Sequence, residues 1–157
     1  MARRRACSTR AQAPWYANGL RFTCTRCGGC CGGGPGYVWL GADEIERIAR
    51  YLKLPVEEFL QSYCRRVFKR VSLRETANYD CVFFTPAGCR IYSVRPAQCS
   101  SFPFWPDNID SPESWEDTKT RCPGAGQGRL YQRAEIETIR DRLRTTRGAE
   151  GSGTASC

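Results

Sequence analysis

Apolar residues in the first half of the chain recur with the period of two amphipathic helices. Residues 42–53 carry them at spacings of three and four, at Ile45, Ile48, Ala49 and Leu52. Pro55 interrupts this pattern and suits the first position of a second helix, where its missing N–H is not needed. The second helix is predicted to have one apolar face, formed by Val56, Phe59, Leu60, Tyr63 and Cys64. Cys64 is therefore expected to be a core residue and not a metal ligand.

Alternation of polar and apolar residues predicts short strands around and after these helices. Residues 37–40 form a short apolar run, and residues 66–74 alternate with a period of two, which is typical of a strand. Residues 81–92 predict a hairpin, because a turn containing proline and glycine separates two apolar runs. This hairpin would place Cys81 and Cys89 near the outer ends of its strands.

The second half of the chain has weaker patterns. Residues 102–106 combine aromatic residues with proline and are expected to be extended. Residues 107–120 are acidic and lack an apolar period, which predicts a surface loop, and residues 122–128 predict a glycine-rich turn. A last helix is predicted over residues 130–147, with three side chains facing inward: Ile136, Ile139 and Leu143.

These elements predict a small, loop-rich single domain of the α+β class, with three helices and a few short antiparallel strands. A chain of 157 residues has about the length of one domain. We expect residues 1–20 to form a flexible basic arm, residues 21–147 to form the domain, and residues 148–157 to be a disordered tail. Cys7 in the arm and Cys157 in the tail are expected to be dispensable.

Composition indicates how such a domain is stabilised and where it is found. With 15 Gly, 9 Pro and 11 Cys, the chain needs cross-links of some kind. No apolar run approaches the ~18 residues of a membrane-spanning helix, so no membrane association is expected. The basic start is not followed by an apolar segment, so we expect no secretory signal and a cytoplasmic location, where thiols stay reduced. The odd cysteine count also argues against a complete disulfide framework.

Four of the cysteines lie within the eight residues Cys24–Cys31, a segment that we call the cysteine loop. Neighbouring cysteines rarely meet the geometry of a disulfide, whereas thiolates at these spacings converge on one metal centre. The glycines that follow allow the backbone to wrap closely around such a centre. The domain is therefore expected to be organised around a cysteine-bound metal.

Histidine is absent from the chain, which narrows the chemistry. Zinc sites of the mixed Cys/His type are excluded, leaving all-cysteine zinc or an iron–sulfur cluster. The commonest general base is missing as well, so Ser-His and Cys-His nucleophilic catalysis are excluded for this chain alone.

Eight cysteines are candidate metal ligands once those of the arm, the second helix and the tail are set aside. They are Cys24, Cys27, Cys30, Cys31, Cys81, Cys89, Cys99 and Cys122. The spacing C-x7-C-x9-C of the later members differs from the paired C-x2-C units of zinc knuckles. It favours a wider iron–sulfur cluster, such as [4Fe–4S], with one or two clusters in redox or modification chemistry. The alternative is a zinc-stabilised, non-enzymatic module that binds nucleic acid or an acidic protein.

The net charge of +8 is compatible with such an acidic partner. It is carried by 21 arginines and 3 lysines that are scattered along the chain, and such scattered charge favours a solvated surface over a specific patch. One arginine stands out. Pro96 biases Arg95 toward an extended conformation four residues before Cys99, where its guanidinium would donate hydrogen bonds to thiolate or sulfide. The alternatives are that Arg95 caps a turn through backbone carbonyls or pairs with Asp80.

Several of these motifs together resemble the CxxCxxCC (YkgJ-type) cysteine-cluster family. The similarity lies in the cysteine loop and in five later features: Cys81, Cys89-Arg-Ile-Tyr, Arg95-Pro96-x2-Cys99, Phe102-Pro103-Phe104 and Cys122-Pro123-Gly124. It covers residues 22–128. The resemblance implies a domain that chelates zinc or iron, and it leaves the reaction open.

Overall fold

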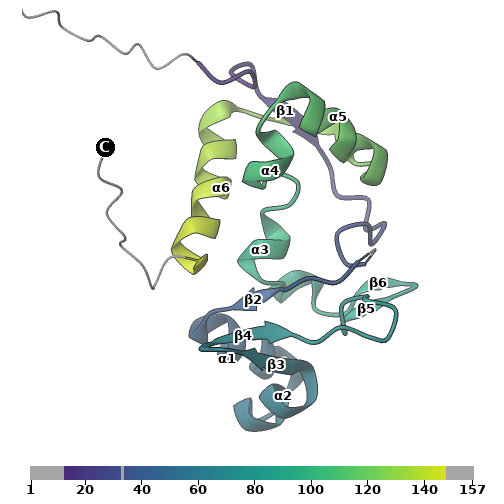
Figure 1. Ribbon diagram of the computed structural model, residues 1–157, viewed down its shortest axis with the longest axis vertical. Helices are drawn as coiled ribbons and strands as arrows, with labels where there is room; N and C mark the ends of the chain where they lie inside the picture. Colours follow the sequence, from purple (N-terminus) through teal and green to yellow (C-terminus); the bar gives the residue numbers. More distant parts are fainter. Residues whose placement is uncertain (1–12, 33, 148–157) are drawn as a thin grey trace, which may run out of the picture.

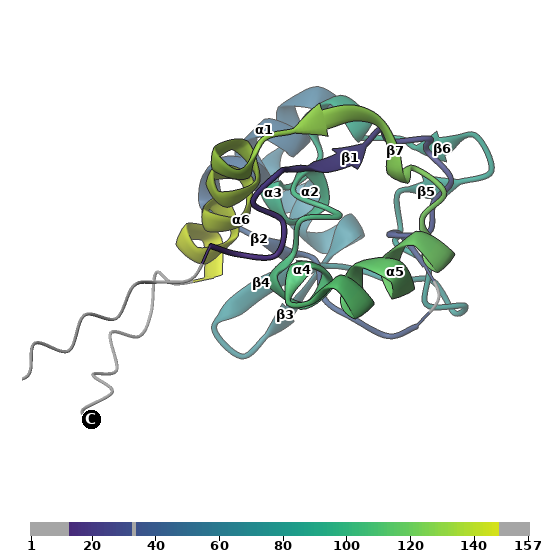
Figure 2. The ribbon, with the colours of Figure 1, turned by 90° about the horizontal axis from the view of Figure 1, so that it is seen from above.

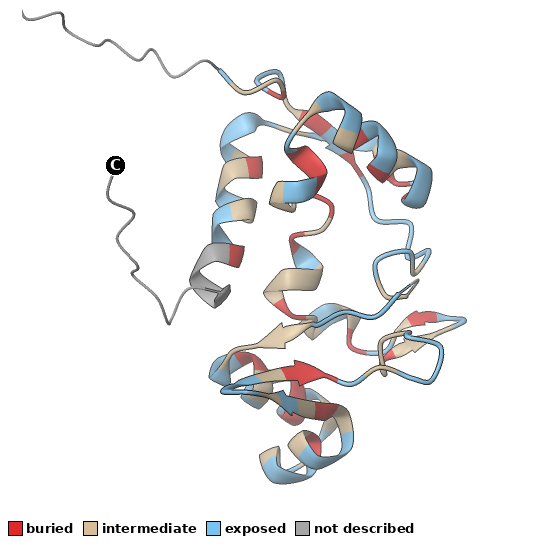
Figure 3. Ribbon diagram, viewed as in Figure 1, coloured by how far each residue is buried: buried red, intermediate tan, exposed pale blue. Residues whose placement is uncertain are grey.

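Two hydrophobic clusters organise the fold, and the chain passes between them more than once (Figures 1 and 3). The computed structural model describes residues 13–32 and 34–147. The first part of the predicted arm, Cys7, the predicted tail and Cys157 lie outside these ranges. Within them, no helix has the length and apolar character needed to cross a lipid bilayer.

The first cluster joins the beginning of the described chain to its end. Strand β1 (Leu20–Phe22) pairs antiparallel with β7 (Ala125–Tyr131), as the view from above in Figure 2 shows. Three helices pack beside this pair: α4 (Pro106–Ile109), α5 (Pro112–Arg121) and α6 (Arg133–Arg147). In its centre the rings of Phe104 and Trp115 stack at 6.2 Å.

The second cluster lies between a small sheet and two helices. The sheet has the order β2-β4-β3, with β2 (Trp39–Leu40), β3 (Cys64–Val67) and β4 (Arg70–Leu73). Helices α1 (Ala42–Leu52) and α2 (Val56–Tyr63) contribute Ile48 and Phe59 to the core. The short hairpin of β5 (Phe84–Thr85) and β6 (Gly88–Cys89) extends beside this cluster in Figure 1.

A short helical segment connects the two clusters. It consists of a 3-10 turn (Tyr92–Val94) and helix α3 (Ala97–Ser100), which carries Cys99. The buried carboxylate of Glu44 on α1 accepts hydrogen bonds from the backbone N–H of Gly41 (2.9 Å) and of Ala97 (2.7 Å). One side chain therefore caps α1 and fixes the start of α3.

The predicted α+β class is confirmed, and so are several elements. The helix expected over residues 42–53 is α1, the hairpin expected within residues 81–92 is present, and Ile136 and Leu143 are buried. The described residues contain six α-helices, where three were expected.

The prediction of a surface loop over residues 107–120 was wrong, because this segment forms the end of α4 and most of α5. The hydroxyl of Ser111 caps α5 by accepting a hydrogen bond from the N–H of Ser114 at 3.1 Å. The inward face of α5 carries Trp115 and Thr118, both buried. Since one of these two residues is polar, an apolar period is hard to see in the sequence.

Two strand predictions also need correction. Residues 66–74 do not form one strand, because the chain reverses at Phe68 and Lys69 and Val67 pairs with Arg70. Phe68 adopts a φ of 53°, which is unusual for a residue with a side chain, and no glycine or asparagine marks the turn. The last helix begins at Arg133 and not at residue 130, since the residues before it pair with β1.

The cap of α5 can be tested by replacing Ser111 with alanine. We expect the free energy of unfolding to fall by about 1 kcal/mol, because one N–H at the helix start loses its partner. Chemical denaturation followed by circular dichroism measures this change. Alanine at the exposed Ser62 of α2 is the control and should stay within about 0.5 kcal/mol of the original chain. Equal effects of the two substitutions would contradict the cap.

Cys64 should be among the least reactive of the described thiols. It is 4% exposed, and burial raises its pKa to about 11 while the nearby Arg74 acts in the opposite direction. Because the thiolate is the reactive form, we expect iodoacetamide at pH 8 to modify Cys64 only after the metal-free protein is unfolded. Mass spectrometry of the alkylated peptides gives the order of modification. Early alkylation of Cys64, together with the exposed Cys24 and Cys27, would contradict its place in the core.

Candidate metal centre

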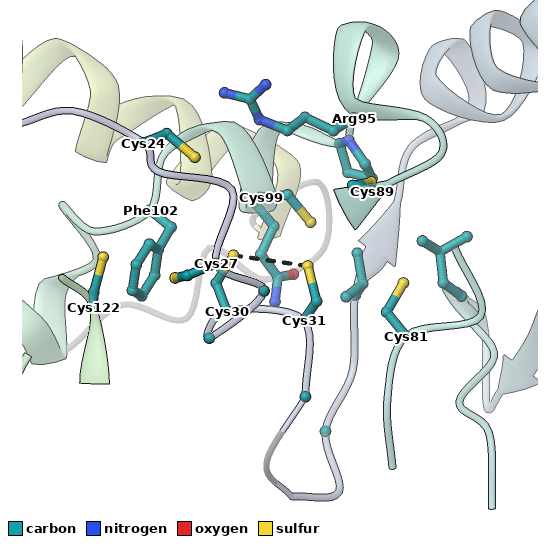
Figure 4. A pocket seen from close by; sticks show the side chains of 18 of the residues that line it. Cys24, Cys27, Cys30, Cys31, Cys81, Cys89, Arg95, Cys99, Phe102 and Cys122 are labelled. Carbon is teal, nitrogen blue, oxygen red and sulfur yellow. Dashed lines mark hydrogen bonds between the residues drawn. The ribbon is translucent and has the colours of Figure 1, made fainter. Parts of the chain in front are cut away.

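A cavity of about 500 Å³ lies between the two hydrophobic clusters, and all eight candidate ligands line it (Figure 4). Four come from the cysteine loop and four from later segments: Cys24, Cys27, Cys30, Cys31, Cys81, Cys89, Cys99 and Cys122. Cys64 does not line the cavity, in agreement with its predicted place in the core. The structure thus brings together cysteines that are far apart in the sequence.

Backbone hydrogen bonds hold these segments against one another. The N–H of Cys81 donates to the carbonyl of Cys31 at 2.7 Å, which joins the cysteine loop to the segment before β5. The N–H of Thr23 donates to the carbonyl of Gly124 at 3.2 Å, where β1 leaves β7. Cys24 and Cys122 are therefore delivered by two neighbouring chain segments.

Two glycines allow the cysteine loop to pack this closely. Gly28 has a φ of 79°, and a side chain there would collide with the ring of Phe84 on β5. A Cβ atom at Gly29 would lie 2.6 Å from the carbonyl oxygen of Arg121, next to Cys122. Glycine at both positions lets the loop contact β5 on one side and the end of α5 on the other.

The thiols differ in their exposure to solvent. Cys24, Cys27 and Cys30 of the cysteine loop are exposed, whereas Cys122 is buried and the other four are half-buried. The loop therefore forms the solvent side of the cavity.

Cys30 and Cys31 form a close thiol pair within the site. Their sulfur atoms lie 3.8 Å apart. The hydrogen bond from Cys31 lowers the pKa of Cys30 to about 7, with Arg95 acting in the same direction. The same hydrogen bond, together with burial and the neighbouring thiols, raises the pKa of Cys31 far above its ordinary value. Within this pair, Cys30 is thus the thiol that ionises first.

The surroundings of the remaining half-buried and buried thiols raise their pKa values and so favour the neutral form. Burial is the main cause of the raised pKa values of Cys81, Cys89, Cys99 and Cys122. Repulsion by neighbouring thiolates adds to it: Cys81, Cys30 and Cys89 all raise the pKa of Cys99. These thiols are close enough to act on one another, and a positive ion among them would favour their charged forms.

Positive charge already lies at the edge of the cavity. The guanidinium of Arg95 lies 3.9 Å from the ring centre of Tyr92, and that of Arg26 lies 4.4 Å from the same ring. Arg95 acts on the sulfur atoms as well, since its charge lowers the pKa values of Cys89 and Cys99. Figure 4 shows its side chain extending along the edge of the group of cysteines.

Arg95 also makes the backbone contact that is expected if it caps a turn. Its Nη1 donates a hydrogen bond to the carbonyl of Tyr92 at 2.9 Å. No ion pair joins Arg95 to Asp80 within the described ranges. The side chain of Arg95 therefore both contacts the turn and lowers the pKa values of nearby thiols.

Tyr92 and Arg26 were missed as candidate site residues. A hydrogen bond with Cys24 is the largest cause of the raised pKa of Tyr92, so its hydroxyl contacts a cysteine of the loop. Both residues had a signal in the sequence, because Arg26 lies inside the cysteine loop and Tyr92 ends the Cys89-Arg-Ile-Tyr motif.

The donor set fits a thiophilic metal. Soft thiolates select zinc and iron–sulfur clusters, and cysteine is the one ligand type shared by all these segments. Within residues 13–32 and 34–147, no three Cys, Asp or Glu side chains are gathered tightly enough to hold an ion.

Comparison with known proteins places this site in a family. The chain is 31% identical over 91 residues to the uncharacterized protein MJ0661 of Methanocaldococcus jannaschii. This match covers 57% of the chain and 48% of the relative, so the chain spans about half the length of that protein. No solved structure matches the chain. The family CxxCxxCC, described as "Putative zinc- or iron-chelating domain", matches residues 23–123. Because this match includes every cysteine that lines the cavity, the chain belongs to the CxxCxxCC family of zinc- or iron-chelating domains.

Proposed function

We propose that this chain holds an iron–sulfur cluster of the [4Fe–4S] type in the cysteine-lined cavity. The observation that carries the proposal is the convergence of eight cysteines on one cavity of about 500 Å³. Four thiolates are sufficient for one structural zinc ion, which is usually enclosed tightly at Zn–S distances of about 2.3 Å. A wide cavity with additional thiols agrees better with a polynuclear cluster, and it leaves room for a second one.

The cysteines have different roles in this proposal. The half-buried Cys31, Cys81, Cys89 and Cys99 lie on the inner side, where a ligand is protected from water. The exposed Cys24, Cys27 and Cys30 keep one side of the centre open to a partner. An iron–sulfur cluster supplies one-electron transfer when bound, which suits redox chemistry or the modification of a second molecule. Residues 21–147 would form the metal-binding unit.

Arg95 and Arg26 would adjust the electrostatics of the centre. An all-cysteine site accumulates negative charge, and two guanidiniums beside Tyr92 offset part of it. The nine described cysteines are all free thiols, which agrees with a reducing compartment such as the cytoplasm.

Metal and sulfide analysis of protein purified without oxygen tests this function. We expect iron and acid-labile sulfide in equal amounts, and a brown colour. Cys27→Ser should reduce the iron content and lower the stability, because the free energy of metal binding is also free energy of folding in such domains. Cys64→Ala is the matched control, since Cys64 does not line the cavity, and it should retain iron. A colourless protein that contains zinc and no sulfide would refute the iron–sulfur proposal and favour the zinc-stabilised module.

The role of Arg95 can be separated from its contact with the turn. We expect Arg95→Ala to lower the reduction potential of the loaded protein, because removing a positive charge disfavours the reduced, more negative state. Arg95→Lys retains the charge and should change the potential less. Arg50→Ala, at an exposed position of α1, is the control. Unchanged iron content and potential in both Arg95 variants would leave this residue with the Tyr92 carbonyl contact as its role.

A further inference from the structure

A second surface feature lies on the small sheet, beside the cysteine-lined cavity, and Tyr37 lines both. The register places Trp39 opposite Ser72 on β4 and Ser72 opposite Arg65 on β3. Side chains of alternate residues share one face of a sheet, so Tyr37, Trp39, Arg65 and Arg70 lie on the same face. Aromatic and cationic side chains are thus interleaved on one surface.

These four side chains form a continuous stack. The rings of Tyr37 and Trp39 are stacked at 4.7 Å between their centres. The guanidinium of Arg70 lies 4.0 Å from the centre of the Trp39 ring, and that of Arg65 lies 4.8 Å from the centre of the Tyr37 ring. Arg65 also pairs with Glu75 at 2.9 Å, whereas no acidic partner of Arg70 is found among the described residues. Arg70 is therefore oriented by Trp39 while its charge remains uncompensated.

The turn of the β3–β4 hairpin completes the feature. Phe68 at this turn is 94% exposed, the largest exposure of the described bulky apolar residues. Its φ of 53° costs free energy that asparagine or glycine would avoid. Residues 64–74 contain five arginines and lysines and no acidic residue. Phe68 therefore exposes an aromatic ring, at an unfavourable backbone φ, in a hairpin whose charged residues are all basic. Such an exposed ring does not contribute to the hydrophobic core.

A groove connects this turn to the aromatic stack. It has a volume of about 660 Å³ and is lined by six residues: Tyr37, Trp39, Val67, Phe68, Lys69 and Arg70. We call it the hairpin groove. The hairpin turn lies at the opposite end of the sheet from β5 and β6 in Figure 1 and projects from the body in Figure 2.

We propose that the hairpin groove binds single-stranded nucleic acid. The exposed ring of Phe68 offers a stacking surface for an unpaired base, and cations beside it attract the adjoining phosphates. Tyr37 and Trp39, whose ring faces are covered within the stack, line the same groove and border the base. Lys69 and Arg70 supply the positive charge. The proposal does not depend on which metal occupies the cysteine-lined cavity.

The shape of the surface favours a nucleic acid over two other acidic partners. A membrane would bind an exposed aromatic tip on a convex surface, whereas here Phe68 borders a groove that Tyr37 and Trp39 also line. An acidic peptide would use the cations through its carboxylates and would not require the exposed ring of Phe68. A base with its phosphate uses both the rings and the cations.

The test is the binding of a short, fluorescein-labelled oligouridylate to the metal-loaded chain, measured by fluorescence anisotropy at several salt concentrations. We expect Phe68→Asn to weaken binding roughly tenfold or more, since one stacked base contributes about 1–3 kcal/mol. The dependence of affinity on salt should not change, because no phosphate contact is lost. Lys69→Gln should instead reduce the slope of log affinity against log salt by about 0.7 for the lost phosphate contact.

Two matched variants serve as controls. Tyr79 is also an exposed aromatic residue at positive φ, 53% exposed with φ of 64°, and it lies outside the hairpin groove but lines the cysteine-lined cavity. Tyr79→Asn should therefore bind the oligonucleotide as the original chain does. Lys53→Gln, at an exposed lysine at the end of α1, should leave the salt slope unchanged. Iron content is measured in every variant, so a defect of the metal centre is recognised separately.

Three results would overturn the proposal. The first is the absence of oligonucleotide binding, or an equal loss in Phe68→Asn and Tyr79→Asn. The second is equally tight binding of polyglutamate, which would assign the surface to acidic proteins through charge alone. The third is Phe68-dependent binding to phosphatidylserine vesicles without binding to the oligonucleotide, which would assign the hairpin turn to a membrane surface.

Discussion

Eight cysteines around one cavity repel one another when they ionise, and the fold has to accommodate this repulsion. Burial raises the pKa of Cys99, and the neighbouring sulfur atoms of Cys81 and Cys30 raise it further. Arg95 opposes this effect only in part. A bound metal supplies the missing positive charge inside the cavity. Metal binding, thiol ionisation and closure of the site are therefore one linked equilibrium.

This linkage matters because neither hydrophobic cluster encloses the cavity alone. Phe22 and Phe102, which line it, belong to the first cluster, while Leu73 and Ile91 belong to the second. The segments that join the clusters are short, and the cysteine loop is largely exposed. A metal held by thiolates from several of these segments acts as a cross-link between the two clusters. Small loop-rich domains commonly depend on such a cross-link, because their hydrophobic burial alone is limited.

The sequence was most informative where local spacing determines structure. Helix α1 followed from its apolar period, and the grouping of the eight cysteines followed from their chemistry. The β3–β4 turn could not be predicted in this way, because Phe68 occupies a backbone conformation that phenylalanine seldom adopts. Helix α5 was hidden because its inward face includes the buried Thr118, whose hydroxyl is satisfied by the carbonyl of Ser114 at 2.8 Å. In both cases tertiary contacts override the local pattern.

Contacts between segments that are distant in the sequence explain which features of the site could not be predicted. Cys31 and Cys81 lie next to each other because a backbone hydrogen bond joins two segments that are distant in the sequence. The guanidiniums of Arg26 and Arg95 both lie beside the ring of Tyr92. This arrangement depends on how the 3-10 turn faces the cysteine loop. Spacing along the chain predicted the cysteines that line the cavity, whereas it does not show how closely one loop approaches another.

The hairpin groove and the cysteine-lined cavity are joined through Tyr37, which lines both, and through hydrogen bonds of Gln98. Gln98, next to Cys99 on α3, donates a hydrogen bond to the carbonyl of Tyr37 at 2.7 Å and accepts one from the N–H of Trp39 at 3.1 Å. The aromatic strand of the groove is thus bonded to the helix that carries a cavity cysteine. Proximity alone is not energetic coupling, which requires an element with two arrangements. Any effect of metal on the groove would be matched by an equal effect of nucleic acid on metal affinity.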